Sequence, residues 1–318
     1  MGVIQGKKPV LILTGPTAVG KTDISIELAR RINGEIISAD SMQVYRNMDI
    51  GTAKIRPEEM CGIPHYMIDE FEPDEEFNVY IFQQKVKDYL KDIHERGKIP
   101  ILAGGTGFYI QAVLYDVEFT ENQGDTSYRN CLIQQVKEMG THAIYEKLQQ
   151  IDPESAEVIH ENNVKRVIRA LEYFHFTGEK FSTHNEQQRR RESPYSFLYA
   201  VLTMNRVSLY ERIDRRVDLM MEEGLVNEVR NLLDRGYSRE LVSMQGLGYK
   251  EIVSALLGEI TMEEAVYQLK RNTRHFAKRQ MTWFRREKEV TLFNKDEYGS
   301  DEQVVQAILN EGHRRGIL

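Results

Sequence analysis

The sequence predicts an α/β fold in which a parallel sheet is flanked by helices and interrupted by a helical insertion. Three observations support this. Short apolar runs alternate with amphipathic segments in the first third of the chain, a glycine-rich segment follows the first of these runs, and the middle third shows helical patterns without a convincing strand. The length of 318 residues suggests about two domains, at roughly 150 residues per domain.

The predicted strands are short apolar runs. Pro9–Thr14 is the first, and Glu35–Ala39, His65–Ile68 and Ile99–Ala103 follow. Between the last two, apolar residues recur every three or four positions, which predicts an amphipathic helix; they are Val79, Phe82, Val86, Leu90 and Ile93. Strands that alternate with helices indicate βαβ units and a parallel sheet covered on both faces.

The insertion is expected to interrupt the sheet domain, which then comprises residues 1–118 and 197–318, with the insertion at 119–196. Within it, Asp152-Pro153 predicts a helix start, with Asp as the cap and Pro in the first turn. Asn162 or Asn163 is expected to cap the next helix. Phe197–Thr203 returns to strand character, and a long helix is expected from about Thr261 to Arg286.

Composition narrows the class of protein. A formal net charge of −7 excludes a uniformly basic nucleic-acid binder but not a local basic patch. Only Cys61 and Cys131 are present, far apart, which argues against a disulfide scaffold and fits a reducing cytoplasm. No run approaches the ~18 apolar residues of a membrane span, and the polar Met1–Lys8 does not resemble a secretory signal. We therefore expect a cytoplasmic protein without a membrane partner, and a monomer because no coiled-coil seam is evident.

The glycine-rich segment matches the phosphate-binding pattern G-x-x-x-x-G-K-[ST] without a mismatch. It follows an apolar strand and precedes a helix expected at Asp23–Arg31, so a P-loop-type fold is predicted. Backbone amides would surround a di- or triphosphate, Lys21 would reach its terminal phosphates, and the Thr22 hydroxyl would ligate Mg²⁺. The residues are Gly15, Pro16, Thr17, Ala18, Val19, Gly20, Lys21 and Thr22.

The pattern does not identify the phosphate compound. Nucleotide-hydrolysing enzymes usually carry an acid at the end of a second apolar strand, but Ile99–Ala103 ends in Gly104-Gly105-Thr106-Gly107. The acid at a comparable place is Asp40, after Glu35–Ala39. Since strand ends face the ligand crevice, Asp40 is interpreted as a metal-linked carboxylate or a general base, or else as a helix cap. The second glycine-rich turn would approach the same ligand, with Thr106 offering a hydroxyl.

A basic segment lies late in the chain. Residues 271–286 hold no acid, and Arg271, Arg274, Lys278 and Arg285 share one helical stripe. This stripe indicates a polyanion contact, or else a solvated face paired with acids. The insertion repeats the pattern at Lys165, Arg166 and Arg169, whereas Arg189–Arg191 favours a solvated turn. Gln245–Lys250 would wrap a nucleotide loop or simply join two helices.

Together these motifs resemble the bacterial tRNA dimethylallyltransferases, also called isopentenyl-tRNA transferases, over nearly the whole chain. The combination of the phosphate loop with DSMQVYR and the late basic helix is specific, although the loop alone is not. The matching segments are GPTAVGKT (15–22), DSMQVYR (40–46), DIGTAK (49–54), PHYMID (64–69), GGTGFY (104–109), RVIRALE (166–172), QGLGYKE (245–251) and TRHFAKRQMTWFR (273–285).

The resemblance implies transfer of a dimethylallyl group from dimethylallyl diphosphate to N6 of adenosine 37 of tRNA, next to the anticodon, with release of diphosphate. It places the donor's diphosphate and Mg²⁺ on the phosphate loop, makes Asp40 the general base, and assigns diphosphate binding to Arg216. Thr106 would lie at the reaction channel. The implied tRNA contacts are Asp40, Ser41, Met42, Gln43, Thr106, Arg129, Lys165, Arg166, Val167, Ile168, Arg169, Gln245, Gly246, Leu247, Gly248, Tyr249, Lys250, Thr273, Arg274, His275, Phe276, Ala277, Lys278, Arg279 and Gln280.

Two other classes remain open at this point. One is a small-molecule or nucleotide kinase with an adventitious basic helix, against which the missing acid after Ile99–Ala103 counts. The other is a non-catalytic RNA-binding NTPase module. The transferase also requires a flipped target base, which an insertion that binds the anticodon stem-loop would support.

Overall fold

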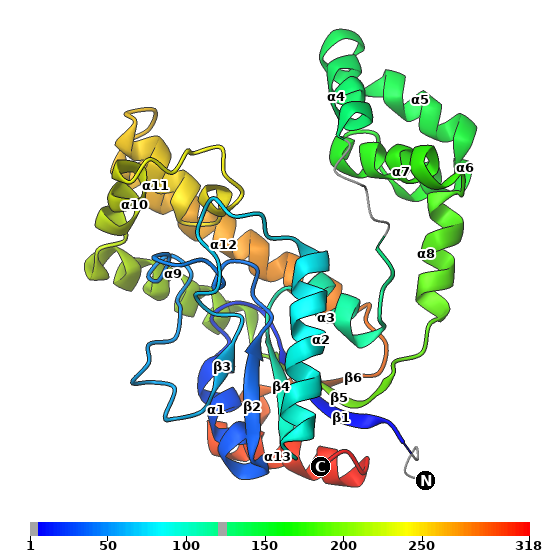
Figure 1. Ribbon diagram of the computed structural model, residues 1–318. Coiled ribbons are helices and arrows are strands. Elements are labelled where there is room, and N and C mark those ends of the chain that lie inside the picture. The colour runs from blue at the N-terminus through cyan, green and yellow to red at the C-terminus, as the bar shows by residue number, and fades with distance from the viewer. Residues whose placement is uncertain (1–5, 120–125) are drawn as a thin grey trace. The chain divides into compact units, whose positions relative to one another are not determined.

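The computed structural model describes residues 6–119 and 126–318 (Figure 1). The polar start Met1–Gln5 and residues 120–125 of the expected insertion lie outside this range. The chain forms two compact units. One contains Met1–Leu114 and Pro194–Leu318, and the other contains Tyr115–Ser193.

The first unit is built on a six-stranded sheet in the order β3-β2-β4-β1-β5-β6. All five strand pairs are parallel, so the predicted parallel α/β sheet is confirmed. In β1, residues Leu11, Ile12 and Leu13 have no exposed surface, because both faces of the sheet are covered. The strands are β1 (Lys8–Thr14), β2 (Gly34–Ser38), β3 (His65–Tyr66), β4 (Ile99–Gly104), β5 (Tyr195–Thr203) and β6 (Val290–Asn294).

Strand β6 and helix α13 (Asp301–Arg314) were not predicted from the sequence. Strand β6 pairs with β5 at the edge of the sheet. An edge strand need not be apolar throughout, and Leu292 of β6 remains 55% exposed, so the sequence of β6 carries only a weak strand pattern. Helix α13 follows β6. Boundaries also shift: β5 begins at Tyr195 rather than Phe197, and β3 ends at Tyr66. Helix α1 (Lys21–Ile32) starts two residues earlier than expected, directly after Gly20.

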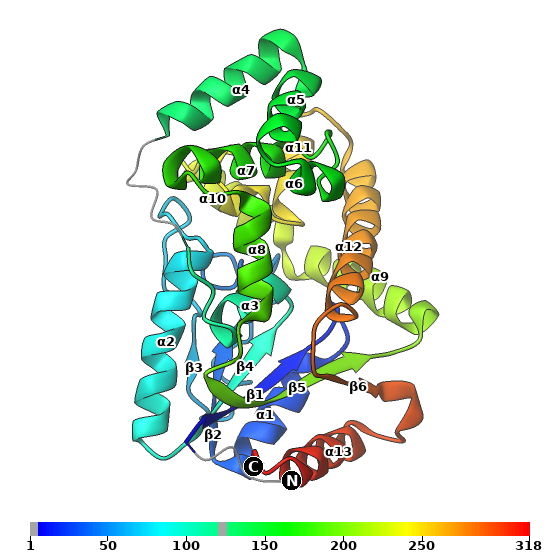
Figure 2. The same ribbon diagram turned by 90° about the vertical axis from the view of Figure 1, so that its right-hand side faces the viewer.

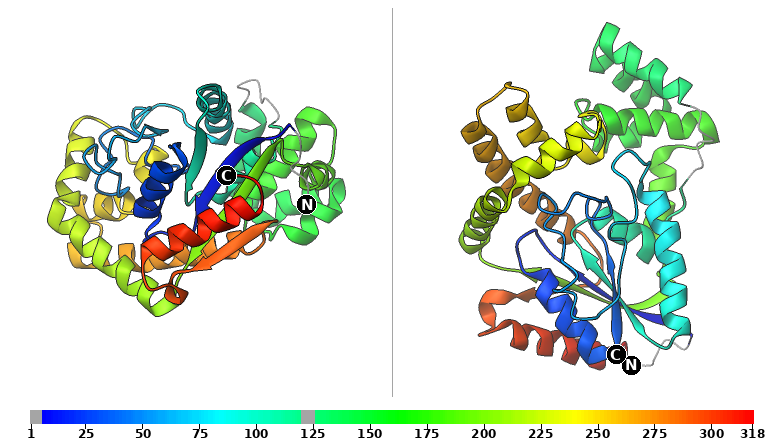
Figure 3. Two further views of the ribbon diagram at one scale, coloured as in Figure 1. Left: turned by 90° about the horizontal axis from the view of Figure 1, so that it is seen from below. Right: turned by 60° about the vertical axis from the view of Figure 1, so that its left-hand side comes forward.

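Helices cover both faces of the sheet (Figure 3). Helices α1 and α13 pack against each other on one face, and α2 (Val79–Glu95) and α3 (Gly107–Leu114) pack together on the other. Asn78 is the N-terminal cap of α2: its side chain accepts hydrogen bonds from the amides of Tyr80 and Ile81, each at 3.0 Å. The stripe Phe82, Val86, Leu90 and Ile93 is buried, as its spacing predicted.

A helical group lies beyond one end of the sheet (Figures 1 and 2). The long helix α12 packs against α9, α11 and α3. Thr261 caps α12 by accepting a hydrogen bond from the amide of Glu264, so this helix begins where the sequence indicated. The members are α9 (Arg206–Glu223), α10 (Leu225–Asp234), the 3₁₀ turn η1 (Ser243–Gln245), α11 (Tyr249–Leu256) and α12 (Met262–Phe284); a second turn, η2 (Lys295–Glu297), follows β6.

The second unit is a bundle of helices around its own core. Leu132, Ile144, Leu148, Val167 and Leu171 are central to that core, each no more than 1% exposed. Asp152 caps the third helix of the bundle as predicted, and its carboxylate accepts hydrogen bonds from the amide and hydroxyl of Ser155. Asn163 precedes the next helix without a side-chain cap. The helices are α4 (Ser127–Met139), α5 (Thr141–Ile151), α6 (Pro153–Val158), α7 (Val164–Thr177) and α8 (Phe181–Arg190).

In residues 6–119 and 126–318, no helix has the length and apolar character needed to cross a bilayer.

Candidate active site

The phosphate loop connects β1 to α1, as its pattern required. Gly15 has φ +149° and its Cα faces the carbonyl of Leu202 so closely that a side chain would collide with it. Gly20 has φ +92°, a left-handed conformation that favours glycine, and it forms the N-terminal cap of α1. The Lys21 ammonium donates to the carbonyls of Gly15 and Pro16, at 3.0 and 2.9 Å, and therefore lies folded over the loop.

The loop opens onto a cavity of about 110 Å³. Side chains from distant parts of the chain meet there. Those relevant to chemistry are Thr17, Lys21, Thr22, Asp40, Gln43, Arg216, Phe276 and Gln280, with Gly104 and Gly105 at the base of the second glycine-rich turn.

The charged groups of the cavity are mutually perturbed. Burial, together with repulsion from Arg216, lowers the pKa of Lys21 to about 8, and the opposite charge of Asp40 limits the shift. Burial and the neighbouring Arg212 lower the pKa of Arg216. The cations Lys21, Arg212 and Arg216 lie beside a loop of backbone amides, and together these groups form a site that attracts anions.

Asp40 follows β2 and serves both the local turn and the cavity. Its Oδ1 atom accepts a hydrogen bond of 2.9 Å from the amide of Met42, a local turn that agrees in part with the cap alternative. Burial raises the pKa of the Asp40 carboxyl, while the Met42 amide and the Lys21 charge oppose that shift. A carboxyl with a raised pKa in a cavity is a good candidate for proton transfer.

Thr106 connects the second glycine-rich turn to the Asp40 turn. Its amide donates to the carbonyl of Ala39 at 3.1 Å, and its hydroxyl accepts from the amide of Ser41 at 3.2 Å. Gly104 packs on the backbone of Ala39 with no room for a side chain. Thr106 therefore fixes the turn that carries Asp40.

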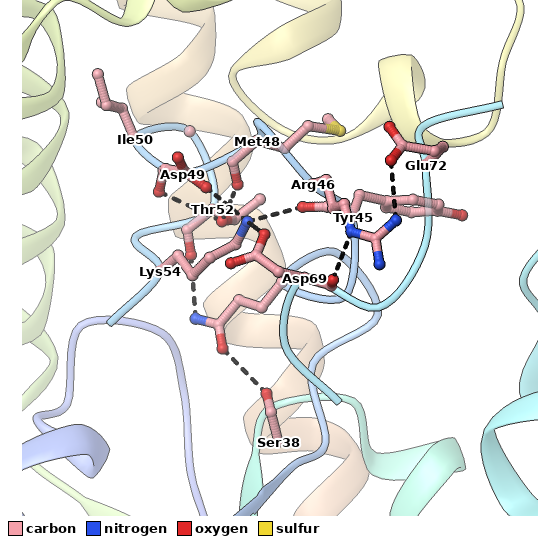
Figure 4. A network of polar contacts seen from close by, with 12 residues as sticks. Ser38, Tyr45, Arg46, Met48, Asp49, Ile50, Thr52, Lys54, Asp69 and Glu72 are labelled. Atoms are coloured by element: carbon pink, nitrogen blue, oxygen red, sulfur yellow. Dashed lines mark hydrogen bonds and ion pairs between the residues drawn. The ribbon is translucent and has the colours of Figure 1, made fainter. Parts of the chain in front are cut away.

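Gln43 is held by a polar network that the sequence did not reveal. Its amide nitrogen donates to the carbonyls of Thr52 and Ala53, and its oxygen accepts from Ser38 at 3.0 Å. The loop containing Thr52 is in turn organised by Lys54, whose side chain is 4% exposed. As Figure 4 shows, the Lys54 ammonium donates to the carbonyl of Tyr45 and to the carboxylates of Asp49 and Asp69.

Two further residues support the site without having been predicted. Glu228 accepts hydrogen bonds from the consecutive amides of Asp49, Ile50 and Gly51, at 2.7–3.0 Å. Arg212 donates from Nε to the carbonyl of Ala18 at 2.9 Å and thus ties α9 to the phosphate loop. A signal for Arg212 existed, because it lies one helical turn before Arg216 and shares its face.

The basic stripe of α12 is only partly open. The Arg274 guanidinium pairs with Asp214 of α9 at 2.5 Å, as the alternative interpretation allowed. His275, Lys278 and Arg279 are exposed, whereas Ala277 and Gln280 are buried. Only part of the segment Thr273–Gln280 can therefore meet a large polyanion.

The Gln245–Lys250 segment joins η1 to α11. Gln245 donates to the carbonyl of Arg239 at 2.6 Å. Tyr249 is fully buried and donates its hydroxyl to Glu228 at 2.6 Å, so its predicted RNA contact cannot be made by this side chain without rearrangement. Gln245 and Lys250 line a second, polar cavity with Asn272 and Gln268.

In the helical unit, Lys165 and Arg166 are exposed, but Val167 and Ile168 pack in the core. Those two apolar side chains thus position the basic residues rather than offering surface themselves. Arg129 forms a two-pronged ion pair with Glu172, through Nε at 2.8 Å and Nη2 at 2.6 Å. The exposed edge of Arg129 remains available, since 45% of its side chain is accessible.

The parallel sheet, the loop between β1 and α1, and the cations gathered around it define a P-loop enzyme that binds a phosphorylated substrate. Residues 43–287 match the family model described as IPP transferase. The chain belongs to the IPP transferase family.

Similar proteins agree with this assignment. A tRNA dimethylallyltransferase of Lachnoclostridium phytofermentans is 60% identical over 94% of this chain and 95% of its own length. One of Acetivibrio thermocellus is 52% identical over 93% and 95%. The crystal structure of a tRNA isopentenylpyrophosphate transferase from Bacillus halodurans is 46% identical, covers 98% and 97%, and has a TM-score of 0.74. A eukaryotic dimethylallyltransferase acting on tRNA is 30% identical, covers 96% and 79%, and has a TM-score of 0.81.

Proposed function

We propose that this enzyme transfers a dimethylallyl group from dimethylallyl diphosphate to N6 of adenosine 37 in tRNA. The observation that carries the proposal is the meeting of Asp40, Lys21 and Arg216 in the cavity at the phosphate loop. This arrangement offers a proton acceptor beside an anion site, as alkylation of an amine by a diphosphate ester requires.

In the proposed reaction, N6 of the adenine attacks the first carbon of the prenyl group. The C–N bond forms, the C–O bond to diphosphate breaks, and the proton of N6 passes to the Asp40 carboxylate. Negative charge develops on the leaving diphosphate, which Lys21, Arg216 and the loop amides stabilise. Thr106 and Gln43 keep Asp40 and its turn in register with the donor.

The site residues fit a magnesium ion that arrives with the donor. Among residues 6–119 and 126–318, no three acidic, His or Cys side chains cluster as ligands. Mg²⁺ commonly binds through few protein ligands and several phosphate oxygens. The Thr22 hydroxyl, in the first turn of α1 and at the cavity wall, would hold the ion, which would neutralise charge on the diphosphate.

The kinase alternative is disfavoured by the sheet. Strand β4 lies directly beside β1, with Leu13 opposite Ala103 and Thr14 opposite Gly104. The acid that holds the metal in many nucleotide-hydrolysing P-loop enzymes would be expected at the end of such a strand, but Gly104-Gly105 occupies it.

Incubation of the protein with tRNA and labelled dimethylallyl diphosphate tests the proposal. Label should enter tRNA at adenosine 37, as mass spectrometry of the digested nucleosides would show. Absence of label combined with steady ATP turnover would instead indicate a kinase or an RNA-binding NTPase.

Both units are proposed to contact tRNA, through exposed basic residues of α12 and of α7. Replacing Lys278 by alanine is expected to weaken tRNA binding a few-fold and to reduce the slope of log affinity against log salt by about one. Arg274→Ala should have the smaller effect on the slope, because Asp214 already neutralises this guanidinium.

Filter binding over a range of salt concentrations measures this effect. Lys91→Ala, an exposed lysine on α2, is the matched control and should leave the slope unchanged. A slope unaltered in Lys278→Ala would mean that this part of α12 faces solvent in the complex.

Diphosphate affinity should decline above about pH 8. Lys21 has a pKa lowered to about 8, so below that pH it is the ammonium that an anion attracts. Above that pH, Lys21 must first be protonated before diphosphate binds, so the affinity for diphosphate falls by up to about tenfold per pH unit. Calorimetric titration with inorganic diphosphate from pH 6.5 to 9.5 measures the decline.

The control is Lys21→Arg, whose guanidinium keeps its charge throughout this range. Changes in the ionisation of diphosphate itself affect both proteins equally. Parallel pH curves for the two proteins would contradict a lowered pKa at Lys21.

A further inference from the structure

Gln280 lies within the basic segment of α12, but its side chain turns away from solvent. It is 6% exposed, whereas its neighbours Lys278 and Arg279 are exposed. It also reaches the cavity at the phosphate loop. A buried amide on this helix is in a poor position to contact a polyanion from outside.

Both ends of the Gln280 amide are engaged. Its oxygen accepts a hydrogen bond of 2.9 Å from the amide of Thr17, in the phosphate loop. Its nitrogen donates to the carbonyl of Gly105 at 2.9 Å, in the turn that precedes Thr106. One side chain thus joins the helix, the donor loop and the turn that fixes Asp40.

The glycine-rich turn is shaped around this contact. A Cβ on Gly105 would collide with the amide nitrogen of Gln280, and a Cβ on Gly107 would collide with the ring of Trp283. Trp283 follows Gln280 by about one helical turn and lies on the same face of α12. Gly105 does not have a positive φ, so glycine is required here because a side chain would not fit, and not because of the backbone conformation. The turn and α12 are therefore complementary surfaces.

We propose that Gln280 is a positioning residue for the donor: its amide bridge between Thr17 and Gly105 holds the phosphate loop in register with the Asp40 turn. This inference rests on the proposed transferase function. Because the Thr17 amide is occupied by Gln280, that point of the loop is anchored, and the remaining loop amides and Lys21 take up fixed positions for diphosphate. Loss of the bridge leaves two backbone groups without a partner and frees the loop to move.

Gln280→Ala is therefore expected to raise the KM for dimethylallyl diphosphate about tenfold to a hundredfold, and to weaken binding of inorganic diphosphate to the same extent. The Kd for tRNA and its salt slope should stay within twofold of the wild type. Thr282→Ala is the matched control, since Thr282 is exposed on the same helix and bonds only to the carbonyl of Lys278 among its described contacts. It should change none of these quantities.

A second variant separates positioning from general loss of structure. Gly105→Ala should displace Gln280 and reproduce its donor defect. The double variant Gly105→Ala/Gln280→Ala should be no worse than Gln280→Ala alone, because the next atom near the added methyl is the carbonyl oxygen of Gly15 at 3.8 Å. Thermal unfolding of each variant shows whether the fold persists, and a purely structural defect would lower kcat and tRNA affinity along with donor affinity.

Each outcome decides the matter. Unchanged diphosphate affinity in Gln280→Ala, or a defect confined to tRNA binding, would overturn the inference, as would losses that add in the double variant. Diphosphate binding by calorimetry requires no turnover. Failure of the wild-type protein to label tRNA would therefore reject the proposed function, whereas the effect of Gln280→Ala on diphosphate binding would still test the positioning role.

Discussion

Replacing Asp40 by asparagine is expected to reduce transfer of the dimethylallyl group by about a hundredfold to ten-thousandfold, while tRNA affinity stays within a few-fold. Asparagine retains an oxygen that can accept the Met42 amide, so the turn after β2 should keep its shape. What it loses is the capacity to accept the proton of N6. Single-turnover kinetics with labelled donor, beside a tRNA binding assay, measure the two effects independently.

The pH profile gives a second measurement of the same residue. Burial raises the pKa of the Asp40 carboxyl, so the wild-type rate should fall as pH decreases through that pKa and the carboxyl becomes protonated. Residual activity of Asp40→Asn should lack this limb. Asp88→Asn, an exposed position on α2, serves as the matched control. Near-normal turnover in Asp40→Asn would remove this residue from the proton-transfer step.

Replacing Lys21 by alanine is the second large effect expected, a loss of about a hundredfold to a thousandfold in kcat/KM for the donor. Lys21 is the cation that the loop itself presents, and charge on the departing diphosphate would lose one of its stabilising partners. The fold should survive, because Lys21 lines the cavity and its hydrogen bonds to the Gly15 and Pro16 carbonyls are only partly buried.

Binding of inorganic diphosphate, the rate of transfer and tRNA affinity should be compared for Lys21→Ala, Lys21→Arg and the distant control Lys91→Ala. We expect diphosphate affinity and rate to fall with alanine, to recover in part with arginine, and tRNA affinity to be unchanged in all three. Full activity of Lys21→Ala would show that another group balances the diphosphate charge.

The sheet domain was accessible from sequence because its signals are local. Val10–Leu13 is uniformly apolar, as the centre of a strand buried on both faces must be, and the glycine-rich loop begins two residues later. The caps at Asp152 and Thr261 also act within three residues of the helices that they start. Strand β6 escaped prediction because an edge strand buries one face only, so its apolar pattern is diluted.

The site was only partly accessible. Lys21 and Thr22 belong to a contiguous pattern, and Asp40 stands at a strand end, so each carries its own signal. The contacts of Gln280 with Thr17 span 263 positions, and those of Glu228 with Ile50 span 178. No periodicity or spacing records such pairs, because they arise from how helices pack beyond the sheet.

The alternation of strands and helices in the first third of the chain, the phosphate loop and the acid after the second strand were thus determined by the sequence alone, through short-range patterns of burial and backbone conformation. Tertiary structure decided which residues of the basic segment face outward and which face the cavity, turning Lys278 to solvent and Gln280 to the phosphate loop. The physical reason is that a helix distributes successive side chains around its axis, and only the surface packed against it determines which of them are buried.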